Sequence, residues 1–402
     1  MFATAGPGTP VQGRRVVVTG VGAVTAAGSG ADVLFKTLCE GVAPESAAVR
    51  GFDPESVFGP KEARRLDRFS QFTLASAIEA FDHARLEVDD PTRAGALFAT
   101  GVGGITTMID QLGVLKDRGP DRVSPFFIPM LMPNAGAAAV SLRYGLRGPC
   151  QTVTTACAAG THAVADAARL IAQGRCDVML TGGGEYASSE IAVAGFRNMT
   201  ALSKTGISRP FDLARDGFVL GEGGAALVLE ELGHATARGA TIYAEILGGA
   251  STADAHHITA PDPASTGAIA CIRLALADAG IDPAEVGHVN AHGTSTPLND
   301  LAEAKALHAV FGDEVPPVTS VKGYLGHSLG AAGAIEAVVS VLTVADAVIP
   351  PTAGTTDVDP AVGLDVVLGS PRPLERRVVL SNSFGFGGHN GTLVLGAVEL
   401  AA

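Results

Sequence analysis

The stretch TTACAAG at residues 154–160 joins a predicted strand to a predicted helix, and this junction decides the fold. Residues 150–155 are short and rich in β-branched side chains, which predicts a buried strand. The Ala-rich segment 158–172 predicts a helix buried on most sides, with Gly174 as its C-cap. Cys157 therefore stands at a helix N-terminus, where free N–H groups and the helix dipole favour a thiolate. A buried structural thiol is the commoner role of a lone cysteine, so other segments must decide.

Composition and charge limit the classes of protein that fit this chain. The chain has 402 residues, of which 47% are hydrophobic and 17% are charged. A chain of this length is too long for one ordinary hydrophobic core, so we predict two halves. The formal net charge of −13 argues against broad nucleic-acid binding. An acidic partner can still bind if the surface carries a local basic patch.

Targeting signals and disulfides are not indicated. No uninterrupted run of about 18 apolar residues appears, so we expect no membrane span. Residues 1–13 lack the basic and apolar regions of a signal peptide and are expected to form a loose tail. Five scattered cysteines argue against a disulfide framework and favour the reducing cytoplasm.

Strand-like and helix-like segments alternate along both halves, which predicts an α/β fold of two similar units, 1–240 and 241–402. Glycine runs at 20–22 and 182–184 are expected to end the strands before them. The proline-rich segment 124–133 is not expected to form a regular helix or a central strand. The predicted strands cover 15–19, 96–100, 176–181, 225–229, 242–247, 287–291, 318–321 and 378–382, and the predicted helices cover 31–41, 61–85, 265–279, 300–311 and 330–346.

Two histidines follow predicted strands of the second half. His292 lies in NAHGTSTP (290–297), and His327 lies in KGYLGHSLGAAG (322–333). Strand ends are where open α/β sheets build their sites, so both histidines are expected to meet Cys157. A zinc site is possible for such side chains, but three separate loops without short ligand spacing disfavour it.

The predicted helix 61–85 carries a basic face, with Lys61, Arg64, Arg65 and Arg68 at helical spacing. An ordinary solvated face and a surface for an acidic partner remain equally open.

Four motifs together resemble the β-ketoacyl-acyl-carrier-protein synthases. These are TACAAG around Cys157, NAHGTSTPLND around His292, KGYLGHSLGAAG around His327, and NSFGFGGHN at 382–390. The resemblance extends from Arg15 to Leu395 and concerns the Cys-His-His condensing enzymes of the thiolase-like superfamily. It implies two βαβαβαββ halves in five α-β-α-β-α layers, usually as a dimer.

The resemblance also implies an acyltransferase reaction. Cys157 would accept an acyl chain from an acidic acyl-carrier protein, and malonyl carrier protein would then lose CO2 and attack the Cys157 thioester. His292 and His327 would stabilise the enolate, and Lys322 would maintain the charge of the site. The substrates travel on a phosphopantetheine arm, so no cofactor and no metal are expected.

Further roles carry over from the same motifs. Backbone N–H groups of Cys157 and Phe386 would form an oxyanion hole for the acyl carbonyl. The remaining expectations are acidic supports at Glu336 and Asp300, pantetheine contacts at Thr294 and Thr296, an acyl-pocket position at Val102, aromatic gates at Phe384 and Phe386, a dimer-side wall at 124–133, and a carrier-protein patch of Lys61, Arg64, Arg65 and Lys204.

This sequence differs from related branches of the superfamily at several motif positions, and these differences disfavour those branches. The presence of Cys157 argues against a chain-length-factor subunit, and His327 argues against the synthase III branch. NSFGFGGHN lacks the late cysteine of the thiolases. Scarce Lys against abundant Arg and Ala suggests a GC-rich genome and a dedicated polyketide or polyene pathway. We therefore retain three alternatives: a decarboxylative condensing enzyme, a ketosynthase subunit active only beside a chain-length-factor-like partner, and a non-catalytic scaffold that holds carrier proteins.

Overall fold

This computed structural model describes residues 13–399. Its central element is one eleven-stranded mixed sheet. The expected loose tail, 1–13, lies outside the described residues except for Gly13. The strand order is β4-β3-β5-β6-β1-β7-β13-β12-β8-β9, with β2 paired to β1, and β10 pairs separately with β11.

The strands are β1 Val16–Thr25, β2 Gly28–Ser29, β3 Ala94–Ala99, β4 Cys150–Val153, β5 Val178–Glu185, β6 Gly223–Glu231, β7 Ala244–Ala253, β8 His288–Asn290, β9 Val318–Thr319, β10 Val348–Ile349, β11 Arg372–Pro373, β12 Val378–Gly385 and β13 His389–Gly396. The helices are α1 Ala31–Glu40, α2 Pro54–Phe58, α3 Pro60–Ala63, α4 Arg68–Ala84, α5 Ile105–Arg118, α6 Phe127–Leu131, α7 Ala135–Tyr144, α8 Ala159–Ala172, α9 Glu190–Asn198, α10 Leu232–Ala237, α11 Thr266–Ala279, α12 Pro297–Phe311, α13 Lys322–Leu325 and α14 Ala332–Asp346.

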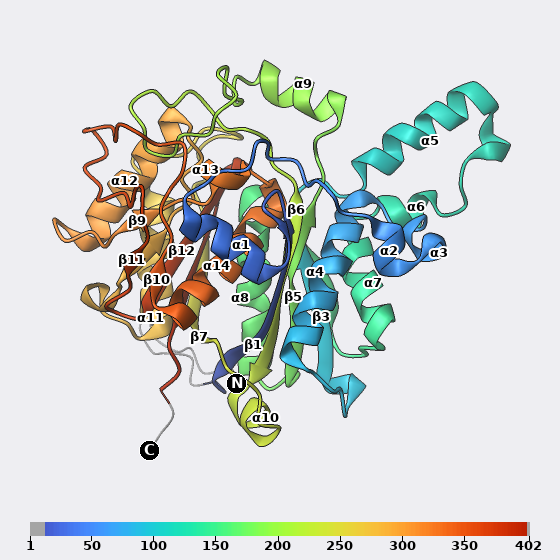
Figure 1. The fold of residues 1–402 in the computed structure, drawn as a ribbon, viewed down its shortest axis with the longest axis horizontal. Helices are drawn as coiled ribbons and strands as arrows, with labels where there is room; N and C mark the ends of the chain where they lie inside the picture. The colour runs from blue at the N-terminus through green and yellow to red at the C-terminus, as the bar shows by residue number, and fades with distance from the viewer. Residues whose placement is uncertain (1–12, 400–402) are drawn as a thin grey trace.

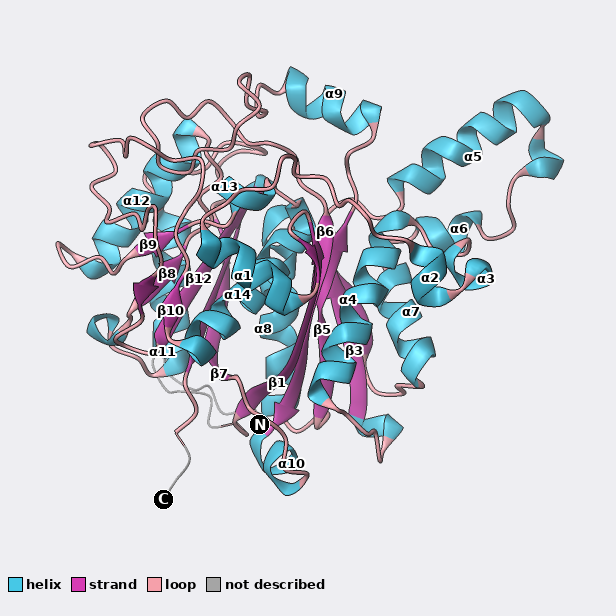
Figure 2. Cartoon of the chain, in the orientation of Figure 1, coloured by secondary structure: helices cyan, strands magenta, loops and turns pink. Residues whose placement is uncertain are grey.

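Helices form three layers around the two halves of the sheet (Figures 1 and 2). Helices α8 and α14 lie in the middle and contact strands of both halves. Helices α4 and α7 cover the outer face of the first half, and α11 packs on β7 and β13 of the second half beside α12. The predicted five-layer α/β arrangement of two halves is confirmed.

Strand β1 joins the two halves of the sheet. It pairs antiparallel with β6 along most of its length and with β7 through Val16–Val18. The predicted division near residue 240 falls between α10 and β7 and stays a prediction.

The two glycine runs lie inside strands, so the expectation that they form turns is wrong. Gly20 and Gly22 belong to β1, and Gly184 belongs to β5. A Cβ on Gly20 would lie 2.2 Å from the Ala80 carbonyl oxygen, and one on Gly184 would lie 2.5 Å from that of Phe69. The glycines therefore let the backbone of α4 pack directly on the sheet.

The strand before Cys157 is not buried, contrary to the prediction. Among the described residues, strand β4 pairs only with β3, at the end of the sheet, and its first residues, Cys150 and Gln151, are exposed. A β-branched run fits an edge strand as well as a central one, because propensity reflects a pleated, half-buried surface.

Two predicted segments differ in their helical structure. The predicted helix 61–85 is interrupted after α3, and Asp67 caps α4 by accepting a hydrogen bond from the backbone N–H of Phe69. The proline-rich segment contains α6, a five-residue helix that sequence patterning did not predict. Pro129 is tolerated there because it lies in the first turn, where N–H groups have no intrahelical partner.

The last long helix is a core element. Residues Leu329–Asp346 are long and apolar enough to span a membrane, but 89% of this stretch is buried inside the fold.

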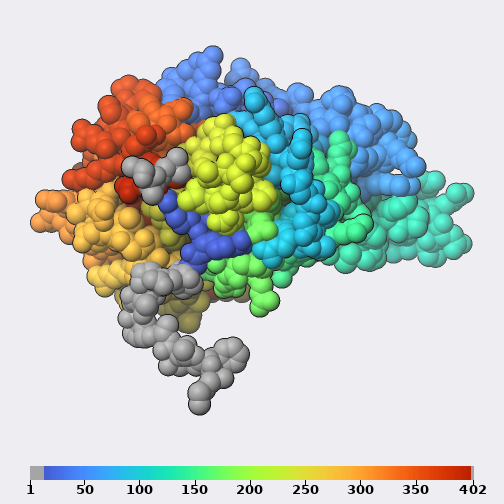
Figure 3. Space-filling view, turned by 90° about the horizontal axis from the view of Figure 1, so that it is seen from below, coloured from blue at the N-terminus to red at the C-terminus, as the bar shows by residue number. Residues whose placement is uncertain are grey.

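Seen from below, α10 lies on the face toward the viewer, while the α5–α6 segment projects from one side (Figure 3).

Candidate active site

The predicted catalytic residues gather where parallel strands end. In one parallel set, β3 pairs with β4 and β5, and in the other, β8 pairs with β12 and β9. Cys157 follows β4, His292 follows β8, Lys322 follows β9, and Phe386 follows β12. Asn290 pairs in register with both Ser381 and Thr319, so these carboxyl ends meet at one edge.

The nucleophile turn holds Cys157 at the start of α8. Ala156 adopts a positive φ of 50°, and Cys157 is 6% exposed. Gly385 leaves room for this turn, because a Cβ there would lie 3.0 Å from the Cys157 nitrogen. Burial raises the pKa of the Cys157 thiol to about 11, although the N–H of Phe386 and the charge of Lys322 lower it. Burial therefore disfavours the expected thiolate in the resting site and opposes the effect of the helix terminus.

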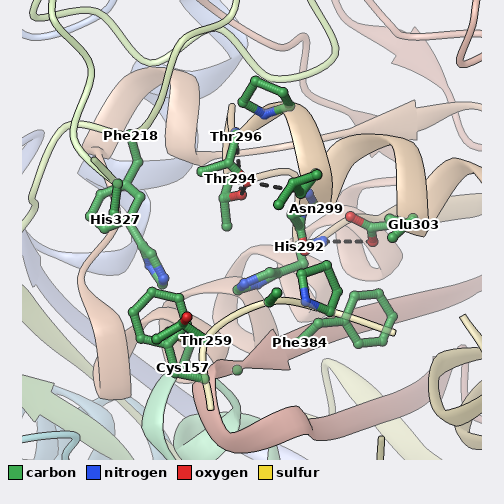
Figure 4. Close-up of a pocket in the computed structure, with 18 of the residues that line it drawn as sticks. Cys157, Phe218, Thr259, His292, Thr294, Thr296, Asn299, Glu303, His327 and Phe384 are labelled. Carbon is green, nitrogen blue, oxygen red and sulfur yellow. Dashed lines mark hydrogen bonds between the residues drawn. The ribbon is translucent and has the colours of Figure 1, made fainter. Parts of the chain in front are cut away.

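The two histidines and Cys157 form a compact triangle (Figure 4). The imidazole rings of His292 and His327 stand nearly perpendicular to each other, with centroids 5.3 Å apart, and both rings point toward Cys157. The ligating atoms of Cys157, His292 and His327 lie within 4.8 Å of one another. A small group bound at this point would contact all three side chains.

Hydrogen bonds at Nδ1 fix the tautomer of both histidines. The Lys322 ammonium, which can only donate, lies 3.3 Å from Nδ1 of His292. The backbone N–H of Leu329 donates to Nδ1 of His327 at 3.3 Å. Since each Nδ1 accepts, each neutral ring must carry its proton on Nε2. The site thus presents two N–H donors beside the sulfur.

Burial keeps both rings uncharged. It lowers the pKa of His292 and that of His327 well below their usual value, and Lys322 lowers both further. Neutral imidazoles act as hydrogen-bond donors rather than as cations, which suits stabilisation of a developing oxyanion.

We expect histidine-selective ¹⁵N NMR to show Nδ1 unprotonated and Nε2 protonated in His292 and His327 from pH 8 down to pH 6. A lowered pKa means that protonation begins only below this range. His292→Gln and His327→Gln assign the two signals. Titration of either ring with a midpoint near 6.5 would contradict the prediction.

Lys322 is held by three acceptors. Its Nζ donates to the His292 carbonyl at 2.7 Å, to Nδ1 of His292, and to the carboxylate of Glu336. Both members of the Lys322–Glu336 pair are almost fully buried. Ser383 links Glu336 to Thr161 on α8. The expected support by Glu336 therefore has a direct geometric basis.

The second expected support, Asp300, does not reach Lys322. Its carboxylate accepts from the N–H of Phe211 at 2.8 Å and of Ser295 at 3.2 Å, so it braces the turn after His292 instead. Glu303, one turn further along α12, accepts from the N–H of His292 at 2.9 Å and of Gly293 at 2.8 Å. Sequence reasoning missed Glu303, although the acidic i, i+3 spacing from Asp300 was visible.

The donor set does not fit a metal ion. A metal ligand needs a free lone pair on the nitrogen that faces the ion, with the other nitrogen donating outward. Here Nδ1 of both histidines accepts a hydrogen bond, so the Nε2 atoms that face Cys157 carry protons.

A cavity of about 560 Å³ opens above the three residues, a volume that suits a small-molecule arm. Thr294 and Thr296 line it, with hydroxyl oxygens 2.9 Å apart, and so do Phe384 and Phe386. Val102 does not line this cavity and is exposed on the surface, so the structure does not bring it to the site as expected.

Phe218 is a further wall residue that sequence analysis did not assign. Its ring packs edge-on against His327 with centroids 5.1 Å apart, and Phe196 of α9 packs against Phe218 in turn. The sequence signal that could have identified Phe218 is its place as the aromatic residue of the segment RDGFVLGEGG (215–224).

The predicted carrier-protein patch is divided. Lys204 is exposed and lines the mouth of the cavity. Lys61, Arg64 and Arg65 are exposed on α3 and the turn after it, and none of them lines the cavity. Arg64 lies near Glu55, and the Arg65 guanidinium stacks on Phe126.

Comparisons with known proteins agree with this geometry. The family described as Beta-ketoacyl synthase, N-terminal domain, matches residues 45–235, and its C-terminal domain matches residues 243–356. The curated 3-oxoacyl-[acyl-carrier-protein] synthase 2 of Coxiella burnetii is 42% identical over 96% of this chain and 100% of the relative.

Two solved structures share the whole fold. A type II polyketide synthase ketosynthase, solved in complex with its acyl-carrier protein, has a TM-score of 0.89 at 31% identity over 96% of this chain and 100% of that chain. The ishigamide ketosynthase/chain length factor has a TM-score of 0.88 at 35% identity, again over 96% of this chain and 100% of that chain.

Proposed function

The chain belongs to the β-ketoacyl synthase family of condensing acyltransferases, and from this premise we propose that Cys157, His292 and His327 carry out a decarboxylative Claisen condensation on acyl-carrier-protein substrates. The observation that carries the proposal is the pair of neutral Nε2–H donors beside the sulfur of Cys157.

In the first step, Cys157 takes the acyl chain. Its sulfur attacks the thioester carbonyl, the C–S bond to the pantetheine thiol breaks, and the proton of Cys157 passes to the leaving thiol. The N–H groups of Cys157 and Phe386 face the sulfur region and would stabilise the tetrahedral oxyanion. Thr294 and Thr296 lie along the cavity wall, where their hydroxyls suit the amides of a pantetheine arm.

In the second step, malonyl carrier protein enters the same cavity. The bond between its methylene and carboxylate carbons breaks, CO2 leaves, and the electron pair forms an enolate whose oxygen accepts from Nε2–H of His292 and His327. The enolate carbon attacks the thioester carbonyl, the Cys157 C–S bond breaks, and the thiolate of Cys157 takes up a proton from solvent. The product is a 3-oxoacyl chain that is longer by two carbons.

An acidic acyl-carrier protein is the proposed macromolecular partner. The described residues place Lys204 at the cavity mouth, and Lys61, Arg64 and Arg65 further along the surface. Local basic residues steer an acidic partner even on a chain with a net charge of −13.

We expect Lys204→Glu to raise KM for carrier-bound substrates about tenfold while leaving kcat largely unchanged, because the charge acts on encounter rather than on chemistry. Lys36→Glu is the matched control, since Lys36 is exposed on α1 and does not line the cavity. A pantetheine thioester without carrier protein should react equally with both variants. An unchanged KM for Lys204→Glu would remove this residue from the docking surface.

A second copy of the chain is the proposed subunit partner, and the cytoplasm is the proposed location. Helices α5 and α6 project from the body and, together with Phe126, expose an apolar face of Ile109, Leu112, Leu115, Phe126 and Ile128. The five cysteines are all free, which suits a reducing compartment.

Intact-mass analysis of the purified lone chain tests the function. The chain is incubated with a panel of acyl-carrier thioesters and then with malonyl carrier protein, and we expect an acyl adduct on Cys157 that malonyl converts to 3-oxoacyl carrier protein. Activity of the lone chain supports the homodimer. Activity only after addition of a chain-length-factor-like subunit supports the polyketide heterodimer, and absence of any acyl adduct under both conditions contradicts the proposal.

A further inference from the structure

Glu185 is a buried carboxylate that the reaction above does not use. It ends β5, has no exposed surface, and its charge is met by backbone N–H groups and one hydroxyl. Its oxygens accept from the N–H of Gly101 at 2.6 Å and of Gly330 at 3.2 Å, and from Oγ1 of Thr100 at 3.1 Å. The N–H of Val102 is a fourth donor.

These donors come from two segments that belong to different halves of the fold. Thr100–Val102 follows β3, and Gly330 lies in the short helical turn Leu329–Ala331 that follows His327. The two segments touch through their backbones, because a Cβ on Gly330 would lie 2.0 Å from the Gly101 nitrogen. Glu185 accepts from both sides of this crossing.

Leu329, which precedes Gly330 at this crossing, has a strained backbone conformation. Leu329 adopts a positive φ of 45°, a conformation that is strained for a non-glycine residue and persists only where neighbours hold it. The N–H of Leu329 donates to Nδ1 of His327, and the next N–H in the chain, that of Gly330, donates to Glu185. Glu185 therefore fixes the Leu329–Gly330 peptide, which adjoins the peptide whose N–H sets the His327 tautomer.

We propose that Glu185 is a positioning residue that holds Leu329 and Gly330 so that His327 keeps its Nε2 proton directed at the substrate. The effect on turnover rests on the proposed function, whereas the effect on the 328–331 segment does not. A purely structural role is a poor explanation, because a buried carboxylate without a cation costs more than an apolar residue at the same position. In agreement, burial raises the pKa of Glu185 to about 7.

Glu185→Gln tests the proposal, because the amide keeps the shape but turns an NH2 group toward a backbone donor. We expect amide hydrogen exchange in a peptide containing Gly330 to accelerate at least about tenfold. We also expect malonyl decarboxylation to slow about tenfold without a matching loss in Cys157 acylation. Only decarboxylation needs the His327 donor, and removing the Glu185 charge removes one cause of the raised pKa of Cys157. Glu185→Asp, one methylene shorter, should show the same split.

Glu230→Gln is the matched control, because Glu230 is equally buried on β6 but is paired with Arg238 away from the site. It should lower Tm without separating the two steps. Unchanged exchange at Gly330 in both Glu185 variants, or an equal loss in both steps, overturns the positioning role. A wild-type chain that neither loads acyl groups nor decarboxylates malonyl thioesters would overturn the proposed function instead, while the exchange measurement still decides the role of Glu185.

Discussion

Replacement of Cys157 by Ala is expected to abolish acyl loading and to lower condensation by at least about 10³-fold, because Cys157 is the only cysteine among the described residues that line the cavity. The fold should survive, since the substitution removes only a sulfur atom among small residues. Malonyl decarboxylation should persist in part, because both Nε2–H donors remain. Intact mass after incubation with acyl carrier protein, and CO2 release from malonyl carrier protein, measure the two effects.

Cys150→Ala is the matched control for this experiment. Cys150 is exposed on the edge strand β4, seven positions before the nucleophile, so its loss should leave loading at the wild-type rate. An acyl adduct that persists in Cys157→Ala, or that disappears in Cys150→Ala, would assign the nucleophile to another residue.

Replacement of Lys322 by Met should damage both stability and catalysis. It leaves Glu336 buried without its cation, and breaking a buried pair from one side typically costs about 3–5 kcal/mol. It also removes the donor that holds Nδ1 of His292, so the ring can turn its lone pair toward the substrate. Chemical denaturation at pH 7 and malonyl decarboxylation report the two losses separately.

The double variant Lys322→Met with Glu336→Leu separates the two roles. Replacing both members of a buried pair by apolar residues is often nearly neutral, so most of the lost free energy of unfolding should return. Decarboxylation should stay low, because the His292 tautomer still lacks its donor. Recovery of activity together with stability would show that Lys322 serves only the fold.

Much of the architecture could be predicted from local patterns. The periodicity at 158–172, 265–279 and 330–346 predicted α8, α11 and α14 within a few residues. Strand-end placement predicted that Cys157 and both histidines would converge, and they do. Patterns succeeded here because burial on one face and at strand ends is encoded in the order of neighbouring residues.

Local patterns failed where a distant segment decides the conformation. The glycine runs at 20–22 and 182–184 resemble turns, but they remain in strands, and α4 packs on the backbone at Gly20, Gly22 and Gly184. The helix expected at 61–85 is interrupted because Asp67 caps a new helix and also accepts from Thr107. In both cases the partner lies tens of residues away, and no single window of sequence contains it.

The sequence by itself determined which side chains could react: one cysteine at a helix start, two histidines after strands, and the lysine five residues before the second. Only the tertiary structure decided how they are protonated. Burial raises the pKa of the Cys157 thiol, and both Nε2–H donors arise from contacts of Nδ1 with Lys322 and Leu329. The physical reason is that residue type sets the available chemistry, whereas desolvation and hydrogen-bond partners, brought together by the fold, select the state in which it operates.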